Sequence, residues 1–443
     1  TRINIISYER LRMPVTEGNR VKDSYAGRLR RRIGCLVADE GHLLANANSQ
    51  QSRALWHLSA KRRFILTGTP APNYPRDIHP LLVFTGGDAT VAQPYGLHRG
   101  YLEENWRQSM SHAVRGIDKF REDFVVMEWC TNEFAEDNRS GAKREIPRLA
   151  NLDKYRALLA PWVKRRLTLE PDVARYIKIP IPTRRITEVE WDENHLAHYL
   201  LVCEEFTQWY RKERGEGQRI NLIALLARIQ AVQFAANFPQ HNGKHSRIYS
   251  PLTSKQRFAV ERLAELTAGG HKTILFADSP DLIEMLAGGL RRQHGIDPVV
   301  FHGGIQITRR TQELDNRFRF GDSPILLATL GTCQAGLNLP QADTALFYNR
   351  SWSAKTEAQA LARMLRPQQT QDVLAEYLML PGSIDDYQGQ MVAAKADTMQ
   401  AGLDWGTPEL DDVEFLHLDT LIGKFTESYA ANLGVHRQDL RKY

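Results

Sequence analysis

The sequence predicts an α/β protein built from two parallel-sheet lobes, and three observations support this fold class. Two short apolar runs, Cys35 to Ala38 and Phe64 to Thr67, each stop at polar residues, as buried parallel strands do at the carboxyl edge of a sheet. From Lys255 onward, strand-like and helix-like patterns alternate, which is typical of a parallel sheet covered on both faces. At 443 residues, 42% of them apolar, the chain is long enough for two or three domains with separate cores.

Charge and cysteine usage narrow the function classes. The net charge of +6 and the isoelectric point near 9.0 are compatible with a polyanionic partner, but over this length they are only a mild basic bias. No apolar run reaches membrane-spanning length, and no run reads as a secretory signal. The cysteines are isolated and lack zinc-ligand spacing, so we expect reduced thiols in an intracellular protein of the cytoplasm or nucleoid, or of the nucleus in a eukaryote. They are Cys35, Cys130, Cys203 and Cys333.

The first lobe is predicted over residues 1–84. Its opening run, I-N-I-I-S-Y, reads as a strand that ends at Ser7 and Tyr8. The later run R-F-I-L-T is another strand, and it delivers the hydroxyl-rich tight turn T-G-T-P at 67–70. Because the carboxyl ends of parallel strands form the edge at which open α/β sheets bind ligands, we expect this turn to lie in a functional site.

An acidic pair follows the strand at 35–38. Asp39 and Glu40 are adjacent carboxylates, and such a pair suits a hard cation such as Mg²⁺ with a water activated next to it. His42 follows closely enough to relay the state of the pair. The sequence therefore predicts a metal-assisted reaction at the carboxyl end of this strand.

Residues 85–250 are predicted to form a helical insertion and a linker. Two long amphipathic helices are expected at 193–214 and 220–238, after a strand at 187–191. Residues 239–254 contain many turn formers and little apolar material, so we expect the interdomain hinge there.

The second lobe is predicted over residues 251–400, and residues 401–443 are expected to be an acidic and helical tail of unassigned function. The lobe alternates strands with helices. Its expected strands are 273–277, 298–302, 325–329, 344–348 and 374–380, and its expected helices are 256–267, 280–293, 308–318 and 355–366.

The last of these helices carries Gln359, Arg363 and Arg366. Positions i, i+4 and i+7 fall within a narrow arc, so the three side chains are expected to share one face until Pro367 stops the helix. Two guanidiniums and an amide on one face would suit a triphosphate, because planar forks stabilise charge developing on the γ-phosphoryl oxygens. A solvated amphipathic helix would show the same spacing.

Several segments together resemble the Swi/Snf-type DNA translocases of the superfamily 2 helicase-like ATPases. They occur in the same order as in the family. The sequence departs from the family pattern at four places: Ala362 stands where the family has a glycine, Pro367-Gln368 where it has isoleucine-glycine, Asn349 where it has an acid, and Ser353 where it has an asparagine. The segments are S-Y-E at 7–9, D-E-G-H at 39–42, L-T-G-T-P-x-x-N at 66–73, F-H-G-G at 301–304, L-A-T-L-G-T-C-Q-A-G-L-N-L at 327–339, Y-N-R-S-W-S at 348–353 and Q-A-L-A-R-M-L-R-P-Q-Q at 359–369.

The resemblance implies two RecA-like lobes of the P-loop NTPase type, with the helical insertion on the first lobe, and ATP and Mg²⁺ as ligands. In this family pattern, Asp39 holds the metal through a water and Glu40 polarises the attacking water, while Arg363 and Arg366 reach the nucleotide from the second lobe. The implied nucleotide-binding residues are His42, Gln359 and Gly336.

The resemblance also implies an ATP-dependent motor that translocates on or remodels double-stranded DNA. The contacts would go to the DNA backbone, so binding would be independent of base sequence and would fall with salt. The implied DNA-binding residues are Ser7, Tyr8, Thr67, Gly68, Thr69, His302, Gly303, Thr329, Asn338 and Trp352.

One part of the family pattern is missing from the sequence. No G-x-x-x-x-G-K-[ST] loop, the Walker A motif that cradles the β- and γ-phosphates, occurs in these 443 residues. Since the chain opens on a strand at Thr1 and not on methionine, we expect a further N-terminal segment to carry it. The alternatives are a catalytically silent nucleic-acid-binding or assembly subunit, and the motor subunit of a DNA restriction or defence complex.

Overall fold

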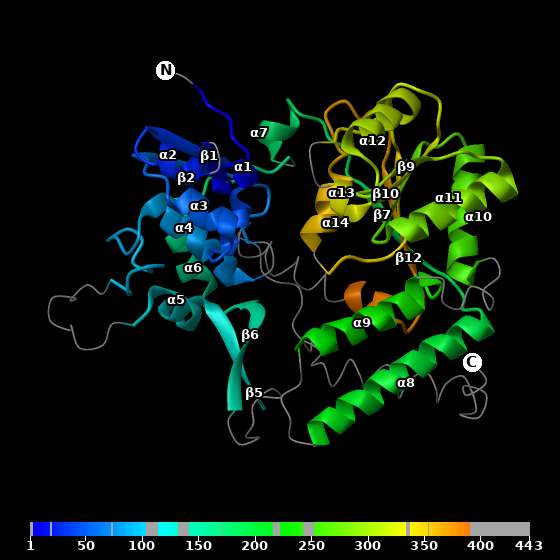
Figure 1. Ribbon diagram of the computed structural model, residues 1–443, viewed down its shortest axis with the longest axis horizontal. Coiled ribbons are helices and arrows are strands. Elements are labelled where there is room, and N and C mark those ends of the chain that lie inside the picture. The colour runs from blue at the N-terminus through cyan, green and yellow to red at the C-terminus, as the bar shows by residue number, and fades with distance from the viewer. Residues whose placement is uncertain are drawn as a thin grey trace. The chain divides into compact units, whose positions relative to one another are not determined.

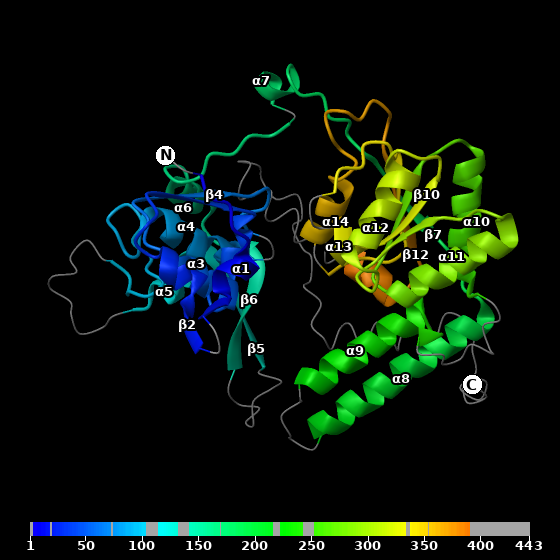
Figure 2. The ribbon, with the colours of Figure 1, turned by 45° about the horizontal axis from the view of Figure 1, so that its top comes forward.

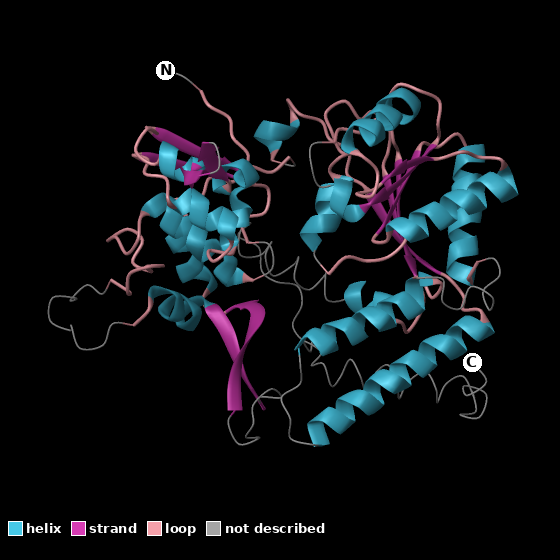
Figure 3. Ribbon diagram, viewed as in Figure 1, coloured by secondary structure: helices cyan, strands magenta, loops and turns pink. Residues whose placement is uncertain are grey.

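The computed structural model describes residues 3–17, 20–71, 74–102, 114–131, 141–168, 170–215, 222–241, 252–333, 337–352 and 354–389. The chain forms two compact units (Figures 1 and 3). The first unit is built mainly from residues 1–130 and 142–165, and the second mainly from residues 166–394. No helix within the described ranges is long and apolar enough to cross a membrane.

The first unit is made of short elements. The strands pair two by two, β1 with β2, β3 with β4, and β5 with β6. The elements are α1 (Tyr8–Arg12), β1 (Pro14–Glu17), β2 (Arg20–Ser24), α2 (Tyr25–Leu29), β3 (Cys35–Asp39), the 3-10 turn η1 (Gly41–Ala45), α3 (Gln50–Trp56), β4 (Arg62–Leu66), η2 (Pro75–Ile78), α4 (His79–Gly86), α5 (Gly116–Phe124), β5 (Val125–Thr131), β6 (Gly141–Leu149) and α6 (Leu152–Leu159).

β3 and β4 pair in parallel, and the two faces of this small sheet differ. Ala38 is buried in the first unit's core, against which Leu36 and Ile65 pack from the same face. On the opposite face, the side chains of Val37, Phe64 and Leu66 are 52%, 52% and 55% exposed. Parallel sheets normally bury both faces, so this apolar face is a surface that could accept another packing element.

The second unit contains a six-stranded sheet in the order β7-β12-β11-β8-β10-β9. Every pairing in it is parallel, which confirms the predicted α/β class. The elements are α7 (Pro171–Ala174), β7 (Thr183–Glu188), α8 (Glu193–Gly215), α9 (Leu222–Asn237), α10 (Ser254–Ala268), β8 (Thr273–Ala277), α11 (Pro280–His294), β9 (Val299–Phe301), α12 (Ile307–Glu313), the π-helical turn η4 (Leu314–Arg319), β10 (Ile325–Thr329), α13 (Leu330–Cys333), β11 (Thr344–Phe347), α14 (Ala354–Leu361) and β12 (Leu374–Met379).

Apolar cores cover both faces of this sheet. One core joins alternate strand residues, such as Leu275 and Leu327, to α8, α9, α10 and α11. The other joins the intervening residues, such as Phe276 and Ala328, to η4, α13 and α14. The helices α8 and α9 lie side by side in both views (Figures 1 and 2), and they contribute Phe206 and Val232, respectively, to the first of these cores.

The predicted division into four domains stays a prediction, but the packing of residues 166–250 differs from it. β7 is an edge strand of the second sheet, and α8 and α9 share that sheet's core, although the sequence assigned them to an insertion on the first lobe. The expected hinge at 239–254 includes Gln240, which is buried and exchanges hydrogen bonds of 2.8 Å with Gln256. The turn-forming residues of 239–254 suggested a linker, but Gln240 in this segment is buried inside the second unit.

Two other expectations about elements were wrong. The expected strand ending at Ser7 and Tyr8 is not formed within the described residues 3–7. The helix α1 begins at Tyr8 instead, because Ser7 caps it by accepting a 3.1 Å hydrogen bond from the backbone of Arg10. The expected helix at 355–366 ends at Leu361. Beyond it the backbone tightens into turns, with Met364 N bonded to Leu361 O at 3.0 Å. Arg363 and Arg366 therefore follow the helix instead of extending its face.

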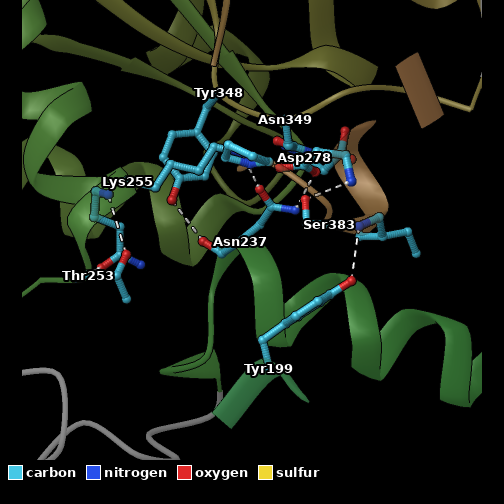
Figure 4. A network of polar contacts seen from close by, with 12 residues as sticks. Tyr199, Asn237, Thr253, Lys255, Asp278, Tyr348, Asn349 and Ser383 are labelled. Atoms are coloured by element: carbon cyan, nitrogen blue, oxygen red, sulfur yellow. Dashed lines mark hydrogen bonds and ion pairs between the residues drawn. The ribbon is translucent and has the colours of Figure 1, made fainter. Parts of the chain in front are cut away.

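A polar network lies in the core of the second unit (Figure 4). Lys255, on α10, is fully buried and donates to Asp385 at 2.5 Å and to Asn237 Oδ1 at 2.7 Å. Its ammonium also lies 4.8 Å from the ring centroid of Tyr348, whose hydroxyl donates to Asn237 O at 2.9 Å. Asn237 Nδ2 donates to the other carboxylate oxygen of Asp385 at 2.8 Å. The network ties the end of α9, the start of α10 and the end of β11 together.

A buried carboxylate anchors the edge strand β7. Glu376, on β12, accepts from Thr187 at 2.6 Å, from Arg185 at 2.7 Å and from Arg262 at 3.1 Å. Burial alone would raise the pKa of this carboxyl, but these hydrogen bonds outweigh burial and hold the pKa below its usual range.

We expect Glu376→Gln to lower the free energy of unfolding by about 1.5–3 kcal/mol at neutral pH, the range for hydrogen bonds to charged groups. Because the folded-state pKa is depressed, this contribution is complete above the unfolded pKa of about 4.3 and is lost as the pH falls through the folded value. Denaturant titrations of both proteins from pH 7 to pH 3 measure it. A difference that stays constant over this range would contradict the assignment.

Candidate active site

The ends of β3 and β4 bring the acidic pair and the threonine turn together. Asp39 is opposite Leu66 in the parallel register, so Glu40 and Thr67 emerge side by side. His42 is buried, and its Nδ1 lies 3.2 Å from Glu40 Oε2 and 3.1 Å from Thr67 Oγ1. Thr67 Oγ1 also accepts from the backbone of Thr69 at 3.1 Å. One imidazole therefore connects the two strand ends, a link that the sequence analysis did not predict.

Glu40 adopts an unusual backbone conformation. Its φ of 49° and ψ of 41° lie in the left-handed region, which costs a non-glycine residue about 1–2 kcal/mol. Gly41 follows, and a Cβ there would come within 2.5 Å of Ile65 Cγ2. The glycine therefore allows the chain to turn closely over β4 directly after the acidic pair. Strain of this kind is concentrated at functional sites.

Tyr8 lies beside the acidic pair. Its hydroxyl donates to the carbonyl oxygen of Asp39 at 2.7 Å. Burial, together with the charges of Asp39 and Glu40, raises the pKa of Tyr8 to about 12. The implied DNA contacts of Ser7 and Tyr8 stay predictions, but the structure gives Ser7 a capping role and Tyr8 a contact with the acidic site.

The acidic pair fits Mg²⁺ better than a cation that needs an all-protein cage. The described residues contain no group of three or more histidine, cysteine or acidic side chains that could hold a metal. Asp39 and Glu40 are both exposed. A cation here would take its remaining ligands from water and substrate oxygens, which is how Mg²⁺ is usually bound.

In the second unit, the two predicted arginines lie beyond α14 in different surroundings. Arg363 Nε donates to the carbonyl oxygen of Cys333 at 3.0 Å, which ties it to the end of α13. Arg366 is half-buried, and its buried Nε has no hydrogen-bond partner among the described residues. A buried donor of this kind is costly unless a ligand or water satisfies it. Gln359 is half-buried on α14, and Gly336 lies outside the described residues.

Two of the predicted DNA-contact residues of the second unit lie at one edge of its sheet. His302 follows β9 and Thr329 ends β10, whose carboxyl ends share that edge. Trp352 lies in the loop after β11. His302 Nε2 lies 3.2 Å from Glu284, and its Nδ1 accepts from Gly304 N at 3.1 Å.

The structure also describes the surroundings of Thr329, Gly303 and Asn338, which belong to the same predicted set. Thr329 Oγ1 lies 2.8 Å from Thr332 Oγ1, a partner that the sequence did not suggest. Gly303 is exposed, and a Cβ there would meet only Thr332 Cγ2, at 3.9 Å. The carbonyl oxygen of Asn338 accepts from Arg319 Nε at 3.0 Å.

Comparison with protein families decides what this chain is. The model of the SNF2-related domain matches residues 1–233, more than half of the chain. The chain belongs to the SNF2-related family. The model of the helicase conserved C-terminal domain matches residues 241–368.

Several curated proteins are similar to this SNF2-related chain over about four fifths of its length. The ATP-dependent DNA helicase DDM1 of Arabidopsis thaliana is 24% identical over 79% of this chain and 43% of that protein. Protein CHROMATIN REMODELING 24 of the same plant is 22% identical over 79% and 32%. The DNA repair and recombination protein RAD54-like of Drosophila pseudoobscura pseudoobscura is 24% identical over 80% and 44%. The chain spans less than half the length of each of these relatives.

Solved structures are also similar to this SNF2-related chain. The Sulfolobus solfataricus SWI2/SNF2 ATPase core in complex with dsDNA is 17% identical, with a TM-score of 0.40 over 90% of this chain and 74% of that one. The C-terminal part of the Fun30 ATPase domain is 14% identical, with a TM-score of 0.39 over 48% of this chain and 90% of that one.

The structure accounts for one departure of this SNF2-related chain from the family pattern. Asn349 stands where the family has an acid, and its Nδ2 donates to Asp278 Oδ2 at 2.5 Å. The backbone of Asp278 donates in return to Asn349 Oδ1 at 3.2 Å. An aspartate at position 349 would place two carboxylates together. The asparagine avoids this repulsion, because its amide donates a hydrogen bond to Asp278, the acid that follows β8. Sequence reasoning missed Asp278 because the pair is 71 residues apart.

A second unpredicted pair holds the loop between β11 and α14. Arg350 donates to Glu357 through both Nε and Nη2 at 3.0 Å, and Ser351 N donates to the same carboxylate at 2.8 Å. The guanidinium also lies 4.4 Å from the ring centroid of Tyr377. This loop carries Trp352, which is 40% exposed.

Proposed function

We propose that this chain belongs to an ATP-dependent motor that translocates along, or remodels, double-stranded DNA. The observation that best supports the proposal is the contact of His42 with both Glu40 and Thr67, which joins two segments that resemble motor motifs at one sheet edge. Membership of the SNF2-related family supports the same class of activity.

Each of the predicted residues has a separate role in the proposed hydrolysis. Glu40 polarises the attacking water, and its carboxylate is half-exposed beside the imidazole of His42. Asp39 would hold Mg²⁺ through a water, and when bound this ion neutralises charge on the phosphate oxygens. Arg363 and Arg366 would stabilise the charge that develops on phosphoryl oxygens during hydrolysis, because guanidiniums match these oxygens.

A phosphate-binding loop must complete such a site. We propose that a segment of the G-x-x-x-x-G-K-[ST] type, which is not present in this sequence, contacts the β- and γ-phosphates. The exposed apolar face of β3 and β4, with Val37, Phe64 and Leu66, is a surface on which such a segment could pack.

The proposed DNA contacts are made to the backbone. In the second unit, Gly303 follows β9 and is exposed, so its backbone groups can meet a phosphate. Trp352 is 40% exposed, whereas Thr329 is buried at the end of β10 with its hydroxyl 2.8 Å from Thr332 Oγ1. Binding should therefore be independent of base sequence. Titrations of unrelated duplexes should give equal affinities that fall as the salt concentration rises.

The function is tested by DNA-stimulated ATP hydrolysis in the intact protein, and Arg366→Ala tests the role of the second unit. We expect the variant to lose about 100-fold in kcat, as expected for removal of one transition-state donor, while the Kd for a non-hydrolysable ATP analogue changes less than about tenfold. Equal losses in both quantities would show that Arg366 only binds nucleotide.

Arg291→Ala is the matched control. This arginine is 46% exposed on α11 and is engaged with Asp297 at 2.6 Å, and neither residue belongs to the predicted site, so removal of its guanidinium should leave kcat close to that of the unmodified protein. If the intact protein binds DNA but does not hydrolyse ATP, the silent binding or assembly subunit replaces the motor.

A further inference from the structure

The helix α1 is docked firmly on the elements around the acidic pair. Its Leu11 is buried in the first unit's core. Glu9 accepts from Gln51 at 2.7 Å, and Arg12 donates to Gln50 at 2.8 Å, so both ends of α1 are joined to α3. The first residue of α1, Tyr8, is therefore held at a defined distance from the end of β3.

The peptide group between Asp39 and Glu40 is restrained at both of its polar atoms. Its carbonyl oxygen accepts from the hydroxyl of Tyr8 at 2.7 Å. Its N–H donates to the Oδ1 atom of Asp39 at 3.0 Å. Directly after this peptide, Glu40 has a φ of 49°. Rotation of the peptide would relax the strained conformation and move the Glu40 carboxylate away from His42.

We propose that Tyr8 is a positioning residue for the acidic pair: its hydroxyl fixes the Asp39–Glu40 peptide and thereby holds Glu40 in the left-handed conformation that places its carboxylate beside His42. The inference rests on the proposed function, because it assigns Tyr8 to the hydrolytic site. It differs from the sequence-based expectation, in which Tyr8 contacts DNA. A tyrosine suits this role because the ring packs against the first unit's core while the hydroxyl reaches the strand end.

The test compares Tyr8→Phe with Tyr25→Phe in the intact protein. Both changes remove one hydroxyl next to α1, since the Tyr25 hydroxyl accepts from Arg10 at 2.6 Å. Only Tyr8 touches the acidic pair. We expect Tyr8→Phe to lower kcat at saturating DNA by about three- to tenfold, which is the loss expected from one hydrogen bond, with an unchanged Kd for DNA. Tyr25→Phe should leave kcat unchanged.

A second readout does not depend on hydrolysis. Amide hydrogen exchange at Glu40 and Gly41 should become faster in Tyr8→Phe, while exchange in α3 and β4 stays the same, because only the restraint on the Asp39–Glu40 peptide is lost. Unchanged exchange and unchanged kcat in an active protein would overturn the inference. So would a weaker affinity for DNA with kcat preserved, which would make Tyr8 a DNA contact. If the unmodified protein does not hydrolyse ATP, the proposed function fails, and the exchange result still decides whether Tyr8 restrains the peptide.

Discussion

Glu40→Gln is expected to abolish DNA-stimulated ATP hydrolysis and to leave DNA binding intact. The change keeps the shape of the side chain and removes the carboxylate that we propose as the base for the attacking water, an effect of about 10²–10⁴-fold on kcat. His42 Nδ1 would still have Thr67 Oγ1 as a partner at 3.1 Å, so the strand ends should remain connected. Steady-state turnover at saturating DNA and the Kd for a labelled duplex measure the two properties.

The matched control for this change is Glu122→Gln. Glu122 is an exposed carboxylate on α5 that lies 3.2 Å from Lys119 and is not part of the predicted site. Its loss should change turnover very little, because exposed ion pairs contribute at most about 1 kcal/mol to stability. Unchanged turnover in Glu40→Gln would reject the assignment of the acidic pair.

Lys255→Met is expected to lower the free energy of unfolding of the second unit by about 3–5 kcal/mol. The ammonium of Lys255 is fully buried with Asp385, and its removal leaves a buried carboxylate without its cation. Burial lowers the pKa of Lys255, although the charge of Asp385 opposes this effect. Denaturant unfolding, or hydrogen exchange in β8 and β11, measures the loss.

Two comparisons separate this loss from a general effect of removing a cation. Replacing both partners, in Lys255→Met with Asp385→Leu, should recover part of the stability, because no unpaired charge remains. Arg257→Ala removes a largely exposed partner of Asp192 and should cost at most about 1 kcal/mol. A loss in Lys255→Met no greater than that in Arg257→Ala would show that the polar network does not stabilise the unit.

The second sheet could be predicted closely from the sequence. The strands at 273–277 and 325–329 agree with β8 and β10 residue for residue, because all of their side chains are buried and form continuous apolar runs between turn residues. The order of these strands in the sheet depends on contacts that no local pattern encodes. The same holds for β7, which joins the edge of a sheet whose next strand in sequence lies 85 residues later.

The two misses have different physical causes. The run at the start of the chain has the apolar character of a strand, but Ile3 and Ile5 are 89% and 96% exposed, and the cap at Ser7 starts a helix. The periodicity of residues 355–366 favoured one long helix. In the structure the helix ends at Leu361, and the carbonyl oxygen of Arg363 in the following turns accepts a 2.8 Å hydrogen bond from Leu339 N instead of one within a helix. Tertiary hydrogen bonds decided the outcome in the second case.

The sequence indicated which segments form the candidate site, but it did not indicate the contacts of Tyr8 and His42 that join them. Motif order located the acidic pair and the threonine turn, and the parallel register brought them together as expected. The contact of the Tyr8 hydroxyl with Asp39 O and the left-handed conformation of Glu40 arise only once the chain has folded. No residue type at either position signalled them.

The central claim of the proposed function is that the acidic pair and the arginines serve the same ATP hydrolysis reaction. The most direct measurement is kcat for the unmodified protein, Glu40→Asp, Arg366→Lys and the double variant, all at saturating DNA and ATP. Groups that act on the same transition state are strongly non-additive, so we predict that the double variant is nearly as fast as the slower single variant. If instead the two losses multiply in the double variant, the two groups act independently and the claim is contradicted.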